Sequence, residues 1–458
     1  MIVKSDLCSS QSDKYHRFAE WVYPRVFYIK VIIRELLLVK AIKDFIGHPL
    51  SQIRNLCVGC GACEGVCLQN AIEFKLDLRD YIYKPVVDFD RCTLCMKCVK
   101  VCPSINNEFI KPIYRSMLGR HIKFFTGFSK NHNIRKNGAS GGIITALLLF
   151  MLDRKLVDDV IISKMNRKGR TKSFITNSKE TILSAQGSIY FQTFTGKLIK
   201  EVLRKNDKRY AIVGLPCQIE AFRRAENLFS SFPAKKCVYL GLMCNHINVF
   251  WYLGYLVKHY FKENYEDVVE ISHRKGAWPG GITLKTAHKS IHISLDEFWR
   301  GFPSLNFCSP LGCLFCADHT NVLADISVGD AWLPEVMKKD KIGTSIIIAR
   351  SKRGLEVLRK AQKENAIELT EVSIKKVLKS QPIKEKRLRA SICRLTLRQS
   401  IISAIRIYGF RRTLLCLLPL LHSLASRNLF IRRLVVNSPR NLVIKYELLY
   451  KALGRGIF

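Results

Sequence analysis

The sequence has few acidic residues and no long apolar run. Its 458 residues include 37 Asp or Glu against 75 Lys or Arg, which gives a formal net charge of +38. The longest apolar run near the C-terminus begins at Thr413, spans about thirteen residues and contains a Pro and a His. A helix that crosses a bilayer needs about twenty apolar residues. Since the first residues also form no apolar leader, we expect a cytoplasmic protein without a membrane span.

Motifs for nucleic-acid binding are also missing. No helix-turn-helix, zinc-finger or aromatic-interleaved RNA-binding pattern accompanies the positive charge. The excess is steepest from Lys384 to Phe458, where 16 Lys or Arg face two Glu. Such a charge attracts polyanions, anionic lipid headgroups or an acidic protein partner, and general solubility is the alternative explanation. We expect no nucleic-acid ligand.

Hydrophobic patterning divides the chain into several parts. Apolar residues at helical spacing predict a helical N-terminal extension over residues 1–47. A cysteine-rich part follows over 48–108. From about residue 122, short apolar runs alternate with amphipathic helices, which predicts an α/β core with a mixed sheet and flanking helices. Residues 380–458 are predicted to form a basic, helical tail.

Eight of the 17 cysteines form two copies of one motif, C-x2-C-x2-C-x3-C. Two such runs are typical of bacterial ferredoxins that hold two [4Fe–4S] clusters, in which the fourth cysteine of each run ligates the other cluster. We expect one cluster on Cys57, Cys60, Cys63 and Cys102 and the other on Cys92, Cys95, Cys98 and Cys67. Zinc is the alternative, but zinc sites usually join two CxxC pairs across a longer gap. The cysteine-rich part is therefore predicted to be a small α+β ferredoxin-like domain.

A second set of cysteines lies within the α/β core. Cys308, Cys313 and Cys316 have the spacing C-x4-C-x2-C, which needs a distant fourth ligand, and Cys244 is the candidate. The same spacing occurs in plant-type binuclear clusters, so the cluster type stays open. Structural zinc or free thiols are the alternatives.

A loop of small residues precedes an apolar helix. Gly138, Ser140, Gly141 and Gly142 can present backbone N–H groups to a phosphate, which the positive end of the helix also attracts. Close packing at the start of the helix is the alternative reading of the same residues.

Two further residues lie where predicted strands end. Cys217 falls in the first turn of a helix, where the positive helix end lowers the pKa of a thiol, so it is a candidate catalytic residue. A buried, inert side chain is the alternative. Asp330 ends a strand, which is the usual place of ligands in α/β folds. It is a candidate for binding a hydroxyl or polarising a ring nitrogen, and capping of the next turn is the alternative.

In combination these motifs resemble the coenzyme F420 hydrogenase/dehydrogenase beta-subunit family. The resemblance runs from about Phe124 to about Lys363 and is carried by "GASGGIITALL", "GSIYFQT", "GLPCQIEAFRR", "GLMCNH", "CSPLGCLFCADHTNVLADISVGDAW" and "GTSIIIARS". It implies an N-terminal family region over 122–200 and a C-terminal region over 207–366. It also implies FAD and [4Fe–4S] clusters as cofactors.

The resemblance implies roles for particular residues. Ser140, Gly141 and Gly142 would lie at the FAD phosphates. The other residues that it places at the flavin are Gly187, Ser188, Tyr190, Pro216, Cys217, Gln218, Asp330 and Trp332. A third cluster, of the [4Fe–4S] type, would be held by Cys244, Cys308, Cys313 and Cys316. Ile189 stands where the family usually has a basic residue, which disfavours coenzyme F420 itself as the carrier.

We therefore expect an iron–sulfur flavoprotein oxidoreductase. Electrons would pass between the ferredoxin-type clusters and FAD, and from there to a hydride acceptor or substrate, because a flavin joins one-electron to two-electron chemistry. The expected partners are a ferredoxin or another oxidoreductase subunit, steered by the basic surface. The tail is expected to contact anionic lipid at the inner membrane face. The alternative function is an electron-relay subunit with no substrate of its own, docked to a partner enzyme or a membrane.

Overall fold

The computed structural model describes residues 49–52, 54–105, 116–166, 169–261, 267–428, 432 and 440–454. The chain divides into two compact units, Met1–Gln52 and Ile53–Phe458. Within the first unit only helix α2 (Pro49–Gln52) is described, so the predicted helical extension over 1–47 lies outside the described residues. All other described elements belong to the second unit.

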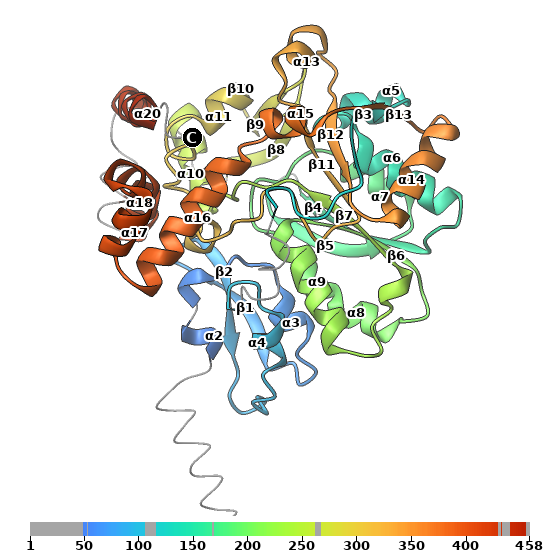
Figure 1. Ribbon diagram of the computed structural model, residues 1–458, viewed down its shortest axis with the longest axis horizontal. Helices are drawn as coiled ribbons and strands as arrows, with labels where there is room; N and C mark the ends of the chain where they lie inside the picture. The colour runs from blue at the N-terminus through green and yellow to red at the C-terminus, as the bar shows by residue number, and fades with distance from the viewer. Residues whose placement is uncertain are drawn as a thin grey trace, which may run out of the picture. The chain divides into compact units, whose positions relative to one another are not determined.

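An eight-stranded mixed sheet forms the centre of the second unit (Figure 1). Its strands are β3 (Lys123–Ser129), β4 (Asp159–Met165), β5 (Thr171–Thr176), β6 (Tyr210–Gly214), β7 (Cys237–Leu242), β11 (Ile326–Asp330), β12 (Ser345–Ala349) and β13 (Ile367–Glu371). They lie in the order β13-β3-β12-β11-β7-β6-β4-β5. Strands β4, β6, β7 and β11 run parallel in the middle, and antiparallel strands flank them on both sides.

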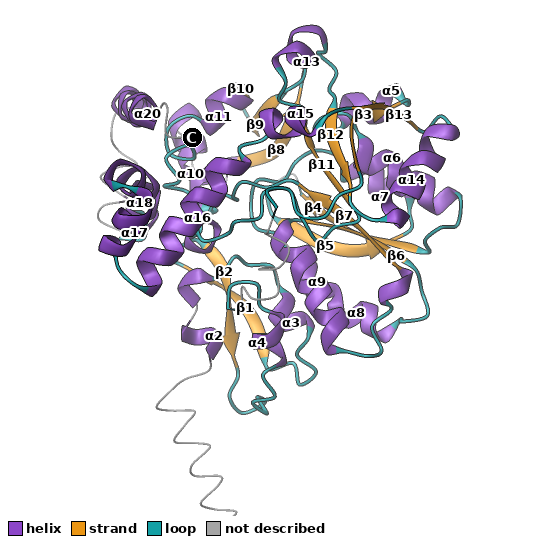
Figure 2. Ribbon diagram, in the orientation of Figure 1, coloured by secondary structure: helices purple, strands orange, loops and turns teal. Residues whose placement is uncertain are grey.

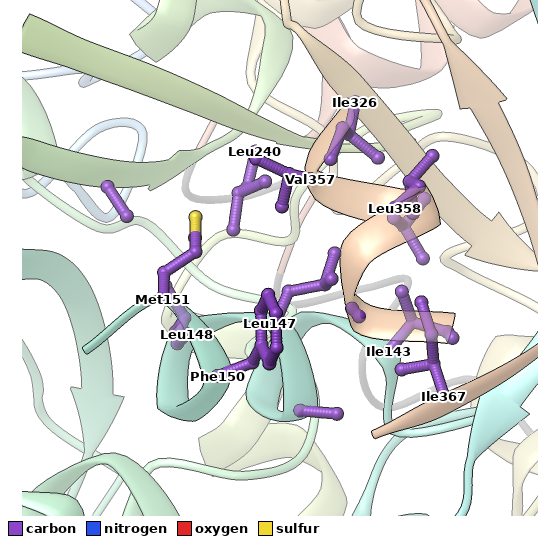
Figure 3. Packing of buried hydrophobic residues seen from close by; sticks show 14 of the residues in the cluster. Ile143, Leu147, Leu148, Phe150, Met151, Leu240, Ile326, Val357, Leu358 and Ile367 are labelled. Carbon is purple, nitrogen blue, oxygen red and sulfur yellow. The ribbon is translucent and has the colours of Figure 1, made fainter. Parts of the chain in front are cut away.

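One face of this sheet is covered by two helices whose apolar positions recur at helical spacing. Helix α6 (Ile143–Asp153) presents Ile143 and Leu147, four residues apart, and α14 (Lys352–Lys363) presents Leu358. Figure 3 shows these side chains packed together in one hydrophobic cluster. Burial of each such side chain stabilises the fold by roughly 1.5–3 kcal/mol.

The other face carries a second core, because successive side chains of a strand point to opposite sides of a sheet. Phe125 and Ile347 belong to the cluster that contains α6 and α14. Their neighbours Phe124 and Ile346 belong to a separate cluster, which includes a residue of α15 (Ile374–Ser380). The sheet is therefore the middle layer of a helix–sheet–helix arrangement (Figure 2).

Two small antiparallel sheets and the remaining helices complete the unit. The hairpin β1 (Ile72–Asp77) and β2 (Ile82–Val87) lies in the cysteine-rich part, and β8 (Val268–Lys275), β9 (Gly281–Thr286) and β10 (Ser290–Ser294) form a three-stranded sheet. The other helices are η1 (Arg54–Leu56), α3 (Ala62–Gly65), α4 (Lys97–Val101), α5 (His132–Asn137), α7 (Lys179–Ser184), η3 (Thr195–Leu198), α8 (Ile199–Arg204), α9 (Pro216–Leu228), η4 (Ala234–Lys236), α10 (Trp251–Phe261), α11 (Leu295–Trp299), α12 (Leu311–Leu314), α13 (Pro334–Lys339), α16 (Ile383–Arg398), α17 (Ile401–Tyr408), α18 (Phe410–Ala425) and α20 (Arg440–Gly454).

The predicted fold class is confirmed. The core is a large mixed sheet with flanking helices, a small two-stranded sheet lies in the cysteine-rich part, and the C-terminal extension is helical where it is described. The apolar run from Thr413 lies within α18, which contains Pro419. None of the described helices has the length and apolar character that crossing a bilayer requires.

Candidate functional site

A cavity of about 300 Å³ lies at the carboxyl ends of the parallel strands, and we call it the strand-end cavity. Strands β6, β7 and β11 are parallel, so the segments that follow them gather at one edge of the sheet, where ligands of α/β folds bind. Leu215, Met243 and Asp330 bring these segments into the lining. Of the predicted site residues, the lining includes Gly138, Ser140, Gly142, Gly187, Ser188, Tyr190, Gln218 and Asp330.

The start of α6 borders the strand-end cavity and carries no side-chain cap. Gly142 stands at the N-cap with φ +71°, a conformation that glycine adopts without strain. A Cβ atom at this position would lie 2.7 Å from the carbonyl oxygen of Ile134. Because the first N–H groups of a helix have no partner within the helix, an uncapped start beside a cavity is suited to an anion such as phosphate.

Gly141 does not take the place that was predicted for it. It is absent from the lining, and its N–H donates to Oγ of Ser345 at 3.0 Å. The hydroxyl of Ser140 lies 2.7 Å from the same oxygen. Ser140 and Gly141 therefore fix the loop to Ser345 of β12. The backbone N–H groups at the start of α6 are then the groups of this loop that suit an anion.

Asp330 is held by a buried arginine that the sequence prediction missed. The Nη2 and Nη1 groups of Arg274 donate to the two carboxylate oxygens at 2.5 and 3.1 Å, and Nε1 of Trp278 donates at 2.9 Å. Arg274 also donates to the carbonyl oxygen of Ala139 in the small-residue loop. Arg274 thus links the end of β11 to the small-residue loop, and these two segments form two walls of the strand-end cavity. The Asp330 carboxylate holds these walls in position and is not free to bind a ligand.

Three other predicted flavin residues are occupied or lie elsewhere. The side-chain amide of Gln218 accepts from the N–H of Leu215 at 2.8 Å and donates to Thr193, so it fixes the turn between β6 and α9. Trp332 is not in the lining, and its ring stacks on Trp278 with centroids 5.5 Å apart. Pro216 lines a neighbouring cavity instead.

That neighbouring cavity, of about 70 Å³, is lined by four cysteines, and we call it the cysteine cavity. They are Cys217, Cys244, Cys313 and Cys316. Burial raises the pKa of Cys217, and the thiols of Cys60, Cys316, Cys244 and Cys313 raise it further, which is opposite to the predicted effect of the helix end. Cys217 lines the cysteine cavity and not the strand-end cavity, where the predicted catalytic role would place it.

Cys308 is not part of this group, contrary to prediction. It is completely buried in a hydrophobic cluster that includes Val249 and Phe307. Burial alone raises the pKa of its thiol, whereas other cysteines also act on the pKa values of Cys313 and Cys217. Sequence spacing could not show that Cys308 lies apart from Cys313 and Cys316. The chain turns at Pro310, before α12 begins, and this turn separates Cys308 from the other two.

A buried lysine from the C-terminal extension lies beside the cysteine cavity. Lys386 of α16 is 2% exposed, and its Nζ donates to the carbonyl oxygens of Cys244 at 2.6 Å and Asp318 at 2.8 Å. Burial lowers its pKa, but the thiolates of Cys316, Cys244 and Cys313 outweigh that effect and the net shift is upward. A positive charge therefore acts on the sulfur atoms of Cys244, Cys313 and Cys316 and favours their anionic forms.

The first cysteine run of the ferredoxin-type part gathers with the last cysteine of the second run. Burial raises the pKa of Cys60, and Cys102 and Cys57 raise it further. Burial also raises the pKa of Cys63, and Cys57, Cys60 and Cys102 raise it further, followed by Cys98 of the second run. The N–H of Gly59 donates to Sγ of Cys57 at 3.3 Å, as expected for a loop that wraps a cluster.

The second run gathers with Cys67 in the same crosswise manner. Burial raises the pKa of Cys98 to about 12, and Cys92, Cys95 and Cys67 contribute. The N–H of Ala71 donates to Sγ of Cys67 at 3.2 Å. In the described parts of the chain, no three His, Cys, Asp or Glu groups converge as ligands of a single metal ion. The donor chemistry, four thiols in each of two groups, fits [4Fe–4S] clusters.

The ferredoxin-type part is packed closely against the core. The N–H of Gly196 in η3 donates to the carbonyl oxygen of Cys60 at 2.9 Å. Leu56 and Val58 line the cysteine cavity from one side, and Cys244 belongs to both this cavity and the strand-end cavity. The cysteine cavity thus borders both the ferredoxin-type part and the strand-end cavity.

His273 gives this region a measurable pH dependence. Its ring is 3% exposed, its Nδ1 lies 3.1 Å from the carbonyl oxygen of Ser188, and burial lowers its pKa from 6.5 to about 4. Below pH 6.5 the His273 ring is protonated in the unfolded chain but stays neutral in the native protein. The free energy of unfolding therefore falls as the pH falls. Relative to His273→Gln, we expect the wild type to lose about 2 kcal/mol of unfolding free energy between pH 7.5 and pH 5. Anaerobic urea denaturation at both pH values measures this, and a constant difference would contradict it.

Comparison with known protein families finds matches over most of the chain. Residues 124–200 and 207–375 match the N-terminal and C-terminal parts of the coenzyme F420 hydrogenase/dehydrogenase beta subunit, which together exceed half of the chain. Residues 56–106 match a 4Fe-4S dicluster domain.

The relatives described next come from Methanosarcina and Methanocaldococcus species. The chain is 26% identical over 301 residues to one of the subunits of the F(420)H(2) dehydrogenase of Methanosarcina mazei, and the match covers 64% of this chain and 80% of the relative. It is 23% identical over 349 residues to the coenzyme F420-dependent sulfite reductase of Methanocaldococcus jannaschii, covering 74% of this chain and 50% of that relative. A chain of the F420-reducing [NiFe] hydrogenase complex from Methanosarcina barkeri is 23% identical, with a TM-score of 0.49 and coverage of 61% and 94%.

The predicted family and the predicted iron–sulfur domain are thereby confirmed. The protein belongs to the coenzyme F420 hydrogenase/dehydrogenase beta-subunit family and carries a 4Fe-4S dicluster domain ahead of the family core.

Proposed function

We propose that the protein is an iron–sulfur flavoprotein oxidoreductase that carries electrons between three clusters and an FAD in the strand-end cavity. One observation supports this most strongly. The cysteine cavity is lined by Leu56 and Val58 of the ferredoxin-type part and also by Cys244, which borders the strand-end cavity. A cluster in the cysteine cavity would therefore stand between the ferredoxin-type clusters and the flavin.

The proposed ligands follow the grouping of the thiols. The distal cluster takes Cys92, Cys95, Cys98 and Cys67, and the middle cluster takes Cys57, Cys60, Cys63 and Cys102. The third cluster takes Cys217, Cys244, Cys313 and Cys316, so Cys217 replaces Cys308 in the predicted set. We propose a [4Fe–4S] cluster there because four thiols surround one cavity.

Residues of the strand-end cavity suit an FAD. The uncapped start of α6 would hold its phosphates, and the Arg274–Asp330 pair would fix the walls around it. Bound FAD would supply the exchange between one-electron and two-electron chemistry. Gly187, with φ +110° in the lining, lets the backbone approach without a side chain.

Electrons would enter or leave at the distal cluster. Cys95 is exposed, whereas Cys60 and Cys63 of the middle cluster are buried. Arg91 and Lys100 are exposed nearby in the sequence, and positive charge would steer an acidic donor such as a ferredoxin. We infer a separate redox protein or another oxidoreductase subunit as the partner.

Anaerobic reduction tests the proposed path. Reduced ferredoxin is mixed with protein that has been reconstituted with iron, sulfide and FAD, and the flavin absorption is followed. We expect the flavin band to bleach after the clusters are reduced, with two electrons taken up per flavin. Clusters that become reduced while a bound flavin stays oxidised would refute the path. Coenzyme F420 is the first acceptor to test because the relatives are named for it.

We also propose that the C-terminal helices contact an anionic membrane surface. Large apolar side chains are exposed on α17, α18 and α20, interleaved with the exposed Arg406, Arg411 and Arg412. The exposed apolar residues are Ile401, Ile402, Ile407, Phe410, Leu414, Leu421, Leu424, Tyr446, Leu448 and Leu449. Apolar side chains that enter the interface, together with basic residues that face anionic headgroups, give peripheral binding.

Point substitutions on this surface test the membrane contact without removing the tail. We expect full-length protein to sediment with vesicles that contain phosphatidylglycerol and much less with pure phosphatidylcholine. Replacing Ile402, Ile407 and Phe410 with Ser should weaken sedimentation at least about tenfold, since each buried apolar side chain contributes roughly 1.5–3 kcal/mol. The control carries Ser at Leu78 and Leu183, which are exposed elsewhere. Equal sedimentation of the two variants with the anionic vesicles would contradict the proposal.

A further inference from the structure

A third cavity, of about 340 Å³, lies between the family core and the C-terminal extension, and we call it the extension cavity. Its volume falls in the range of small-molecule sites. From the core come Asn245, His246, Trp299, Ser304 and Asn306, and from the extension come Glu385, Arg389, Leu415, Cys416 and Tyr450. The extension helices α16, α18 and α20 all contribute to it.

The extension cavity adjoins the strand-end cavity. Asn245, His246 and Trp299 line both, so at these positions a single layer of side chains separates them. The rings of His246 and Trp299 meet edge to face, with centroids 5.3 Å apart. A molecule in the extension cavity would therefore lie next to a flavin in the strand-end cavity.

Two side chains at this cavity hold polar nitrogens that have no partner among the residues that the structure describes. His246 is 9% exposed, and neither of its ring nitrogens has a hydrogen bond to those residues. The Nε of Arg389 is buried and also has none, while Nη2 donates to Asn245 at 3.4 Å. Buried polar groups without partners are costly, and their presence beside a cavity points to a ligand that supplies the missing acceptors.

The chemistry of these groups selects the ligand. A guanidinium presents a planar set of donors that matches a carboxylate, and the imidazole ring of His246 can add a further donor. The buried charge of Lys386 lies on the same helix as Arg389. Glu385 also lines the cavity, so a second acidic group on the ligand would be repelled there, whereas a hydroxyl or amine could donate to it.

We propose that the extension cavity binds a small carboxylate whose charged end is held by Arg389. The layer that contains His246 and Trp299 separates this carboxylate from the strand-end cavity, so it is a ligand beside the proposed flavin site and exchanges no electrons with the flavin directly. The extension thereby completes a ligand site that the family core alone does not close.

Equilibrium binding tests the proposal. Oxidised protein that carries its clusters and FAD is titrated by calorimetry with the monocarboxylates glycolate, lactate and glycerate, and with the uncharged amide of each. We expect saturable binding of at least one carboxylate, weaker binding of its amide, and a shift of the flavin absorption band. If none of the carboxylates binds, or if the amides bind equally well, the proposal is wrong.

Variants on α16 locate the binding. Arg389→Gln should weaken carboxylate binding between roughly tenfold and a hundredfold, and Arg389→Lys should recover part of the loss. Arg387→Gln is the matched control, because Arg387 donates to the carbonyl oxygen of Ser116 and does not line the cavity. Binding that is the same in all variants would overturn the assignment to this cavity. Protein that binds no FAD would refute the proposed function, whereas loaded protein that binds no carboxylate would refute this inference alone.

Discussion

Cys217→Ala is expected to remove one whole cluster and to stop electron flow to the flavin. Cys217 lines the cysteine cavity with Cys244, Cys313 and Cys316, so its loss leaves three thiols for a cluster that needs four. Iron per protein should fall from about twelve to about eight. The two ferredoxin-type clusters should still be reduced by dithionite-reduced ferredoxin, but the flavin band should no longer bleach in the same mixing experiment.

Cys308→Ala is the matched control for this prediction. Cys308 is completely buried and lies in a hydrophobic cluster, so its replacement should cost about 1 kcal/mol of stability and leave the iron content unchanged. Iron and sulfide analysis of the two variants decides between them. The opposite pattern, with iron lost from Cys308→Ala and kept in Cys217→Ala, would restore the ligand set that sequence spacing suggests.

Gly196→Ala is expected to slow electron transfer between the middle and third clusters while all clusters stay bound. A Cβ atom on Gly196 would lie 2.7 Å from the carbonyl oxygen of Cys60 and 2.7 Å from the backbone nitrogen of Ala62. The cluster loop must therefore move away from η3. The rate of electron tunnelling falls with the distance between the clusters, so we expect flavin bleaching to slow severalfold.

Gly254→Ala serves as the comparison for Gly196→Ala. A Cβ atom on Gly254, within α10, meets no heavy atom of the described residues within 4 Å. This variant should keep the wild-type rate of flavin bleaching and the wild-type iron content. Stopped-flow absorption gives both rates, and an unchanged rate in Gly196→Ala would mean that electrons do not cross at this contact.

Local patterns in the sequence were sufficient for the fold class and for the ferredoxin-type part. Short apolar runs that alternate with helices along the chain, such as residues 157–163 and 344–350, coincide with β4 and β12. A strand in a sheet that is covered on both faces must be apolar on both sides, so these runs could be recognised. The crosswise grouping of Cys67 and Cys102 follows from spacing alone, since a short loop places three thiols around one cluster and leaves the fourth for the other.

Contacts between distant segments could not be predicted in this way. Cys308 and Cys217 differ in surroundings that depend on the turn at Pro310 and on the position of α9. Lys386 is one of many basic residues in the tail, and no local signal marks it as the one that is buried beside the cysteines. Arg274 lies in β8, far in sequence from Asp330, so their pairing appears only when the strands are assembled.

The most direct test of the account is an anaerobic count of iron, sulfide and flavin on the purified, reconstituted protein. Three [4Fe–4S] clusters and one flavin predict about twelve irons, about twelve sulfides and one FAD per chain. Partial reduction should then distribute electrons between clusters and flavin in the absorption spectrum. About eight irons and no flavin would contradict the account, because only the ferredoxin-type clusters would remain and the cysteine cavity and strand-end cavity would have no redox role.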